Sequence, residues 1–76
     1  MDKYFLSDEG RARFKRIRIS LDTTDAKFEG FEILDYLYDH GSSTAEELIE
    51  HTGLSRSQLM DRIRTFIHHG FIEGIQ

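Results

Sequence analysis

Apolar residues recur every three or four positions along most of this chain, the spacing that predicts amphipathic helices. After the segment "YFLS", Phe14, Ile17 and Leu21 form one such stripe. Ser7 is suited to cap this first helix, because its side-chain oxygen can accept a hydrogen bond from the first turn. Asp8 follows, where a carboxylate complements the positive end of the helix dipole. We therefore expect a helix that begins after Ser7.

A second stripe predicts a longer helix from about Thr24 to His40. Gly41 would end it, because glycine readily adopts the left-handed conformation that follows many helix C-termini. Gly30 lies inside this segment and costs about 1 kcal/mol relative to alanine, so an irregular first part or a later start stays open. The apolar positions of the stripe are Phe28, Phe31, Leu34, Leu37 and Tyr38.

The segment "SSTAEELIEHTG" predicts a third, short helix. Ser43 and Glu46 have the spacing of a capping box, in which each side chain bonds the backbone N–H of the other residue. Gly53 would stop this helix, and the turn "TGLS" leads directly into the next one. Two short helices joined by so tight a turn form a helix-turn-helix.

The fourth helix opens with a second capping box, formed by Ser55 and Gln58 in "SRSQ", and runs to Gly70. The segment "FIEGI" follows as a short strand, with Phe71 and Ile75 on the same side because strand side chains alternate. Projection of the helix at about 100° per residue gives it one inward, apolar side. That side carries Leu59, Ile63, Phe66 and Ile67.

The outer face of the fourth helix is polar and suits the reading of a DNA groove. Arginine can bond guanine through two hydrogen bonds, glutamine can bond adenine, and serine or threonine can contact phosphates or bases. Asp61, in the middle of the face, repels phosphate, although it can accept from a cytosine amine. The residues that we expect to touch DNA are Arg56, Ser57, Gln58, Arg64, Thr65 and His68.

Two fragments carry a family resemblance. The stretch "STAEELIEHTGLSRSQLMDRIRTFIHHGFIE" resembles the helix-turn-helix core of winged-helix transcription regulators, whose recognition helix ends at glycine and leads into the first wing strand. "YFLSDEGR" resembles the segment that forms the second wing strand in such regulators, but here it precedes the core. The same order also resembles the small winged-helix modules of archaeal-type phenylalanyl-tRNA synthetase alpha chains.

The resemblance implies a single winged helix-turn-helix domain over residues 1–76. Its fold would be mainly α, with three to four helices and a small two-stranded β element. We infer that the wing is formed by the N- and C-terminal strands, "KYFLS" and "FIEGI". The implied function is sequence-specific binding of double-stranded DNA by a transcription regulator, with residues 56–69 as the major-groove recognition helix.

A net charge of -4 argues weakly against a nucleic-acid partner, but the charges are unevenly distributed. Residues 1–20 carry six Lys and Arg against three acids, or +3. Residues 21–50 carry one Lys against nine acids, or -8, and residues 51–76 carry three Arg against two acids, or +1. The middle of the chain must therefore face away from a duplex.

The charges leave two alternatives open. The basic first helix either balances the acidic second helix through weak surface ion pairs or contacts phosphates through Arg11 and Lys15, together with Arg62. The acidic second and third helices would then face solvent or a basic protein partner. The alternative function is thus a non-enzymatic protein-interaction module that docks through this acidic surface.

Other function classes lack their signatures. The chain has no Cys, no glycine-rich phosphate loop and no Gly-x-Ser-x-Gly elbow, so we expect no enzyme and no cofactor. The four histidines fall near predicted helix C-termini, where positive charge is favourable, which explains them without a metal.

No apolar run suggests a signal peptide or a membrane span, so we expect a cytoplasmic protein. We also expect a homodimer, because one small module buries little DNA surface. Tyr4, Phe5, Phe28 or Tyr38 would supply its apolar contact.

Overall fold

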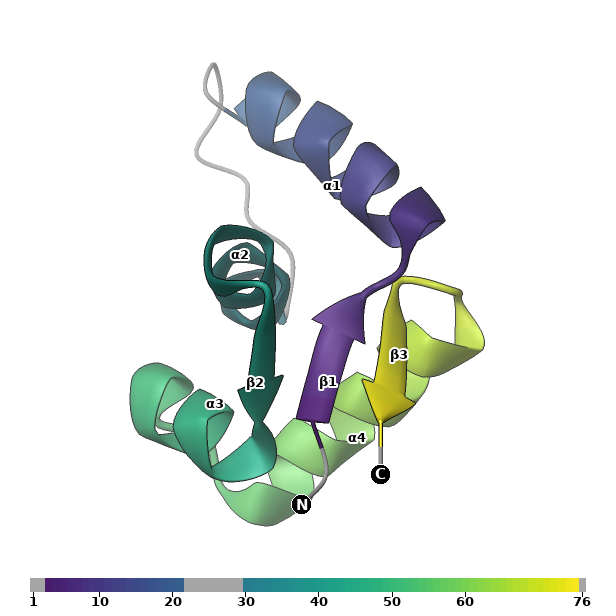
Figure 1. The fold of residues 1–76 in the computed structure, drawn as a ribbon. Coiled ribbons are helices and arrows are strands. Elements are labelled where there is room, and N and C mark those ends of the chain that lie inside the picture. The colour runs from purple at the N-terminus through teal and green to yellow at the C-terminus, as the bar shows by residue number, and fades with distance from the viewer. Residues whose placement is uncertain (1–2, 22–29, 76) are drawn as a thin grey trace.

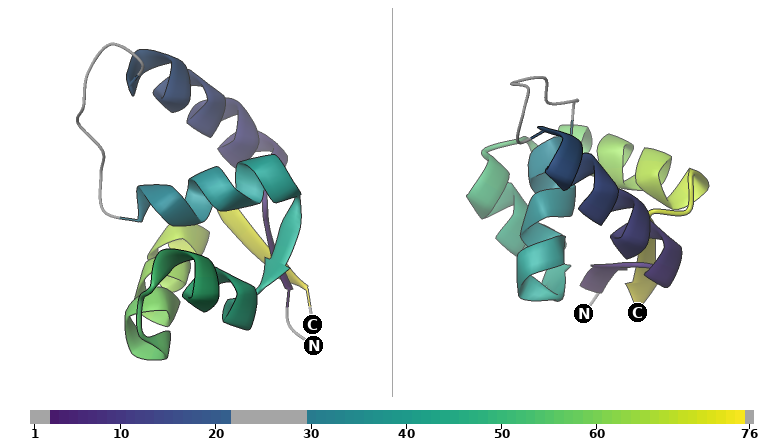
Figure 2. Two further views of the ribbon diagram at one scale, coloured as in Figure 1. Left: turned by 90° about the vertical axis from the view of Figure 1, so that its left-hand side faces the viewer. Right: turned by 90° about the horizontal axis from the view of Figure 1, so that it is seen from above.

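The computed structural model describes residues 3–21 and 30–75, and within them four helices pack together with a small three-stranded sheet. Figures 1 and 2 show α1 at one end of the molecule, α2 in the middle, and the pair α3 and α4 at the other end. In chain order the elements are β1 (Lys3–Leu6), α1 (Asp8–Leu21), α2 (Phe31–His40), β2 (Ser42–Thr44), α3 (Ala45–Thr52), α4 (Arg56–His68) and β3 (Ile72–Ile75).

The sheet is antiparallel, with the strand order β2-β1-β3. Lys3 pairs with Ile75 and Leu6 with Ile72, so the expected pairing of the N- and C-terminal strands is confirmed. The expected number of strands was too small, because β2 adds a third strand through the pair of Tyr4 and Ser43. The segment "SST" has no apolar alternation, and its strand conformation comes from pairing with β1 instead.

The capping box of α3 lies one residue later than the sequence suggests. The Thr44 hydroxyl accepts from the Glu47 backbone N–H at 3.2 Å, and the Glu47 carboxylate accepts from the Thr44 N–H at 3.1 Å. Ser43 lies one residue before the N-cap position, and its buried hydroxyl has no hydrogen-bond partner within the described residues. The same spacing occurs at both positions, and the cap lies at Thr44 because α3 begins at Ala45.

α2 begins at Phe31, which is later than the expected start at Thr24. Residues 24–29 of that expected helix, including Phe28, lie outside the described residues. Gly30 precedes the helix with φ of +87°, a left-handed conformation that favours glycine. A Cβ on Gly30 would also lie 2.7 Å from the ring of Phe66, so this position holds α2 close to α4.

The first helix begins where the sequence predicts. The Ser7 hydroxyl accepts from the Gly10 N–H at 2.9 Å, which confirms Ser7 as the cap of α1. The same hydroxyl donates to the carbonyl of Gly70, and the Ser7 N–H donates to that of Phe71 at 2.9 Å. These bonds fix the start of α1 against the turn between α4 and β3.

One core joins all the layers. Tyr4 belongs to it with 9% exposure, so it cannot supply the expected dimer contact. The sequence placed Ile67 inside, but it is 44% exposed while Ile63 is 1% exposed. Fully buried side chains include Phe14, Ile33, Leu34, Leu37, Leu48, Leu59, Ile63 and Ile72.

The C-terminal strand also differs from its prediction. It starts at Ile72, which is 2% exposed, whereas Phe71 precedes the strand. The Phe71 N–H donates to the Phe66 carbonyl at 2.9 Å and so still belongs to the end of the preceding helix. The strand therefore begins one residue later than the sequence suggests.

Candidate nucleic-acid interface

α4 is held in place by its cap, its turn and its buried side. The Ser55 hydroxyl accepts from the Gln58 N–H at 3.1 Å, and the Gln58 side chain accepts from the Ser55 N–H at 3.1 Å, which confirms the predicted capping box. Gly53 has φ of +77° and donates its N–H to the Ile49 carbonyl at 2.9 Å, which reverses the chain after α3. α4 thus projects its opposite side from a fixed scaffold.

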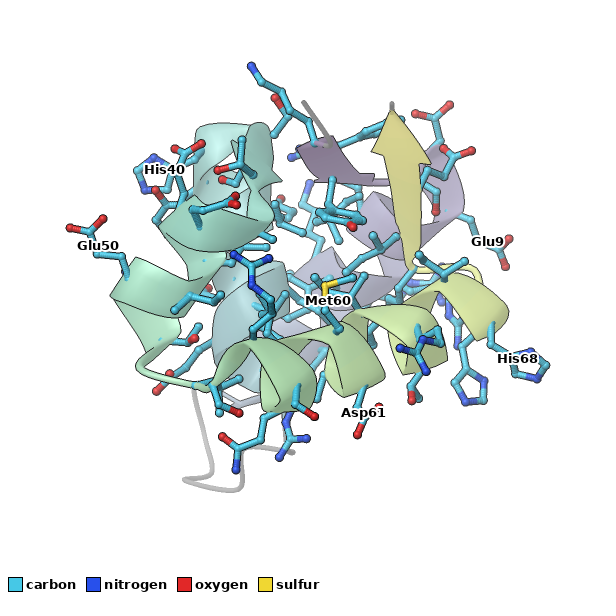
Figure 3. All side chains as sticks on the ribbon, turned by 90° about the horizontal axis from the view of Figure 1, so that it is seen from below. Glu9, His40, Glu50, Met60, Asp61 and His68 are labelled. Atoms are coloured by element: carbon cyan, nitrogen blue, oxygen red, sulfur yellow. The ribbon has the colours of Figure 1, made fainter. Side chains whose placement is uncertain are left out.

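The six residues expected to touch DNA all lie on the exposed surface of α4. Figure 3 shows two labelled members of the outer face, Asp61 and His68, pointing away from the body. The exposed side chains among those predicted are Arg56, Ser57, Gln58, Arg64, Thr65 and His68.

Two of these side chains already make local hydrogen bonds. Gln58 uses its carbonyl oxygen in the cap, so its amide nitrogen is the group that can still read a base. The Thr65 hydroxyl donates to the Asp61 backbone carbonyl at 3.0 Å, and its oxygen can still accept. Gln58 and Thr65 therefore have fewer free hydrogen-bonding groups to offer to DNA than the arginines have.

Arg56 and Arg64, the two exposed arginines of α4, take part in exposed ion pairs. Arg56 lies 3.2 Å from a Glu46 carboxylate oxygen, and Arg64 lies 3.9 Å from one of Asp61. A hydrogen bond from the backbone N–H of Glu46 lowers the pKa of that carboxyl, and the bond from Arg56 lowers it further. Exposed pairs of this kind are individually weak, so both guanidinium groups can exchange a carboxylate for a phosphate or a base.

Arg62 occupies a different side of α4 from the other two arginines. It is half-buried, and its Cδ lies 3.5 Å from where a Cβ of Gly30 would stand. Together with Asp61, Thr65 and Phe66 it lines a small pocket of about 160 Å³. The structure therefore places Arg62 at the flank that faces the start of α2.

Arg11 and Lys15 belong to α1, which packs against α2 and reaches the C-terminal end of α4 through Arg13. The Arg11 guanidinium donates to the Tyr38 carbonyl at 3.2 Å and lies 4.9 Å from the centre of that ring. Lys15 is exposed beside Arg18 and Tyr38. The structure does not bring these two cations together with the outer face of α4.

Arg18 makes the surface ion pairs with the acidic second helix that were one of the two alternatives for the basic first helix. Its guanidinium lies 3.1 Å from Asp39 and 3.5 Å from Asp35, both on α2, and 4.7 Å from the ring centre of Tyr38. The hydrogen bond to Asp39 is the main cause that raises the pKa of Arg18. At this position α1 balances the acidic α2.

The sequence interpretation overlooked two features beside α4. Arg13 donates to the His69 carbonyl at 3.3 Å and covers the Phe71 ring at 4.4 Å, so α1 supports the C-terminal end of α4. Met60 and Ile67 leave apolar surface on the exposed side of the helix. The angular position of Ile67, at the edge of the predicted apolar stripe, is the signal that could have indicated its exposure.

Within the part of the chain that the structure describes, no group of three or more His, Asp or Glu side chains is arranged to hold a metal ion. None of the helices there has the length and apolar character needed to cross a membrane.

Comparison with known proteins gives one match. A family model described as the IclR helix-turn-helix domain matches residues 29–74, which include α2, β2, α3, α4 and most of β3. Neither the curated proteins nor the solved structures include a match. The strand β1 and the helix α1 lie outside the matched residues.

Proposed function

We propose that this chain recognises a specific DNA sequence by placing α4 in the major groove. The chain belongs to the IclR helix-turn-helix family of DNA-binding transcription regulators. The family is one of regulators and not of enzymes, in agreement with the sequence prediction. The residues proposed to contact bases or phosphates are Arg56, Ser57, Gln58, Arg64, Thr65 and His68.

The observation that carries this proposal is the exposed polar side of a helix that is capped at its start and anchored on its inner side. α4 has a complete capping box at its start, and Leu59, Ile63 and Phe66 anchor its inner side. A major groove is wide enough to admit one α-helix. A rigid helix with exposed arginines therefore presents its donors without a large loss of conformational entropy.

The proposed contact residues differ in the DNA groups that they can bind. Arg56 and Arg64 can each make two hydrogen bonds to guanine or pair with a phosphate. Ser57 and the remaining oxygen of Thr65 suit phosphates and base edges, and His68 can donate to a phosphate near the end of α4. Arg62 joins them as a phosphate contact from the flank, whereas Arg11 and Lys15 would reach only a duplex that curves around the body.

Dimerisation is part of the proposal because two half-sites multiply the specificity of one small module. Phe5 on β1 keeps some exposed apolar surface, whereas the Tyr38 ring is covered by Arg11 and Arg18. Two half-sites related by symmetry in the selected DNA would support a dimer, and its mass in solution can be measured by light scattering.

The direct test of specificity is selection from a pool of random duplexes, followed by measurement of the affinity for an enriched sequence and for the same sequence scrambled. Specific binders exceed their own non-specific affinity by about 10³-fold or more. Equal affinity for the two duplexes would contradict sequence-specific recognition.

A second candidate function rests on the acidic surface of α2 and α3. These two helices contain no Lys or Arg, and Glu32, Asp39, Glu47 and Glu50 are exposed on them. Such a surface favours a basic protein partner. Charge reversal at Glu32 and Glu50 would abolish that interaction and leave DNA binding unchanged or stronger.

A further inference from the structure

α4 has two exposed stripes of different chemistry. Arg56, Met60, Arg64 and Ile67 follow one another at spacings of four, four and three residues, so they fall within about 80° of arc around the helix. We call these four residues the cationic-apolar stripe. Gln58, Asp61 and Thr65 form the second, acidic stripe.

The cationic-apolar stripe leaves apolar surface exposed between two positive charges. Ile67 is 44% exposed, and Met60 is half-buried against the core. Figure 3 shows Met60 in the middle of the underside of the molecule, between α3, α4 and the strands. An exposed apolar residue alone is ordinary, but here two of them alternate with arginines on the recognition helix.

The acidic stripe is poorly suited to face the centre of a groove. Asp61 is one residue after Met60 and therefore lies about 100° around the helix from it. The Thr65 hydroxyl donates to the Asp61 carbonyl, and the Gln58 oxygen accepts from Ser55. When the cationic-apolar stripe faces the bases, Asp61 points about 100° away from the base edges. Its charge is then partly balanced by Arg64, which lies 3.9 Å from its carboxylate.

Base edges in the major groove offer one apolar group, the 5-methyl group of thymine. We propose that Met60 and Ile67 pack against thymine methyl groups and make the target sequence thymine-dependent, while Arg56 and Arg64 bind the neighbouring guanines or phosphates. This inference rests on the proposed function, and it adds two specificity residues together with the chemical group that they recognise.

The spacing of the two side chains fixes the spacing of their targets. Seven residues of α-helix span about 10 Å along the axis, which corresponds to about three base-pair steps. The two thymines should therefore lie about three base pairs apart, on either side of the base pair that Arg64 approaches.

Uracil tests the methyl group alone, because deoxyuridine differs from thymidine in that group and keeps the same hydrogen-bonding edge. A duplex selected from a random pool would be synthesised with thymine and again with uracil at single positions. We expect two positions at which uracil weakens binding by about fourfold, the effect of removing one buried methyl group. Positions outside the site should show a ratio near one.

The variant Ile67→Ala tests whether the Ile67 side chain is the group that recognises one of the two thymine methyl groups. The variant should lose the thymine-to-uracil ratio at one position and keep it at the other, and Met60→Gln should do the converse. Ile19→Ala is the matched control, because Ile19 is 61% exposed but lies on α1. It should keep both ratios. Circular dichroism checks folding, and if Met60→Gln does not fold, Ile67→Ala decides.

The outcomes separate this inference from the proposed function. Specific binding with a ratio near one at every thymine of the site would overturn the inference and leave the function in place. Persistence of the thymine-to-uracil ratio at both positions in Ile67→Ala would also overturn it. A failure to select any duplex would contradict the proposed function itself, and the inference with it.

Discussion

The backbone N–H of Ser7 donates to the carbonyl of Phe71 at 2.9 Å, and so joins the first turn of α1 to the end of the recognition helix. Gly10 lies against the same carbonyl, which a Cβ at that position would overlap. The segment outside the family match is therefore packed directly onto the DNA-binding unit.

This contact predicts that Gly10→Ala destabilises the protein. The substitution of glycine in a helix usually stabilises it by about 1 kcal/mol, but here the overpacking should cost about 1 to 3 kcal/mol. Urea unfolding measures the difference, and Arg16→Ala, an exposed change on the same helix, should alter stability little. A stabilised Gly10→Ala protein would show that α1 does not dock as described.

Ser43→Ala should leave stability unchanged or raise it by about 1 kcal/mol. The Ser43 hydroxyl is buried, and it has no hydrogen-bond partner within the described residues. A buried polar group without a partner costs about 1 to 3 kcal/mol, and alanine removes it with little loss of volume. The neighbouring exposed Ser42→Ala serves as the control in thermal unfolding. A clear loss of stability in Ser43→Ala alone would reveal a partner for this hydroxyl.

Phe66→Ala should cost about 3 to 5 kcal/mol, because a buried aromatic ring is lost and a cavity remains. Phe66 is 8% exposed and its ring lies against Gly30. Ile67→Ala, at the next residue but exposed, should change the free energy of unfolding by less than about 1 kcal/mol. Similar costs for the two variants would mean that the orientation of α4 is different.

Arg64→Ala should leave folding intact and weaken DNA binding by about 1 to 3 kcal/mol. Arg64 is highly exposed and its pairing with Asp61 is long, at 3.9 Å, so the fold does not depend on it. Anisotropy titrations compare it with Arg16→Ala on α1, for which no loss is expected. Equal affinities for Arg64→Ala and the unmodified protein would remove Arg64 from the interface.

Much of this fold could be predicted from local signals. Ser7 and the box formed by Ser55 and Gln58 mark helix starts, since capping depends on residues close together in sequence. The strand β2 could not be predicted, because its polar residues adopt it through pairing with a strand almost forty residues away. The cap of α3 lies at Thr44 and not at Ser43, because β2 runs directly into the helix at Ala45.

The sequence indicates which polar residues of α4 point outward, but it does not indicate what packs beside the helix. Helical spacing indicates that Arg64 and His68 point outward, but it does not distinguish Ile67 from Ile63, because exposure there depends on what packs beside α4. The distance of α1 from the outer face is likewise a tertiary property. Charge counts alone therefore could not show that Lys15 lies away from the surface that carries the arginines of α4.

Binding of duplex DNA by α4 is tested most directly by fluorescence anisotropy of mixed-sequence duplex titrated with the protein at low and near-physiological salt. We expect binding at low salt that weakens steeply as salt rises, because each phosphate contact releases counterions, and the slope estimates how many contacts form. The absence of binding even at low salt would contradict this expectation. That result would favour a protein partner at the acidic surface of α2 and α3.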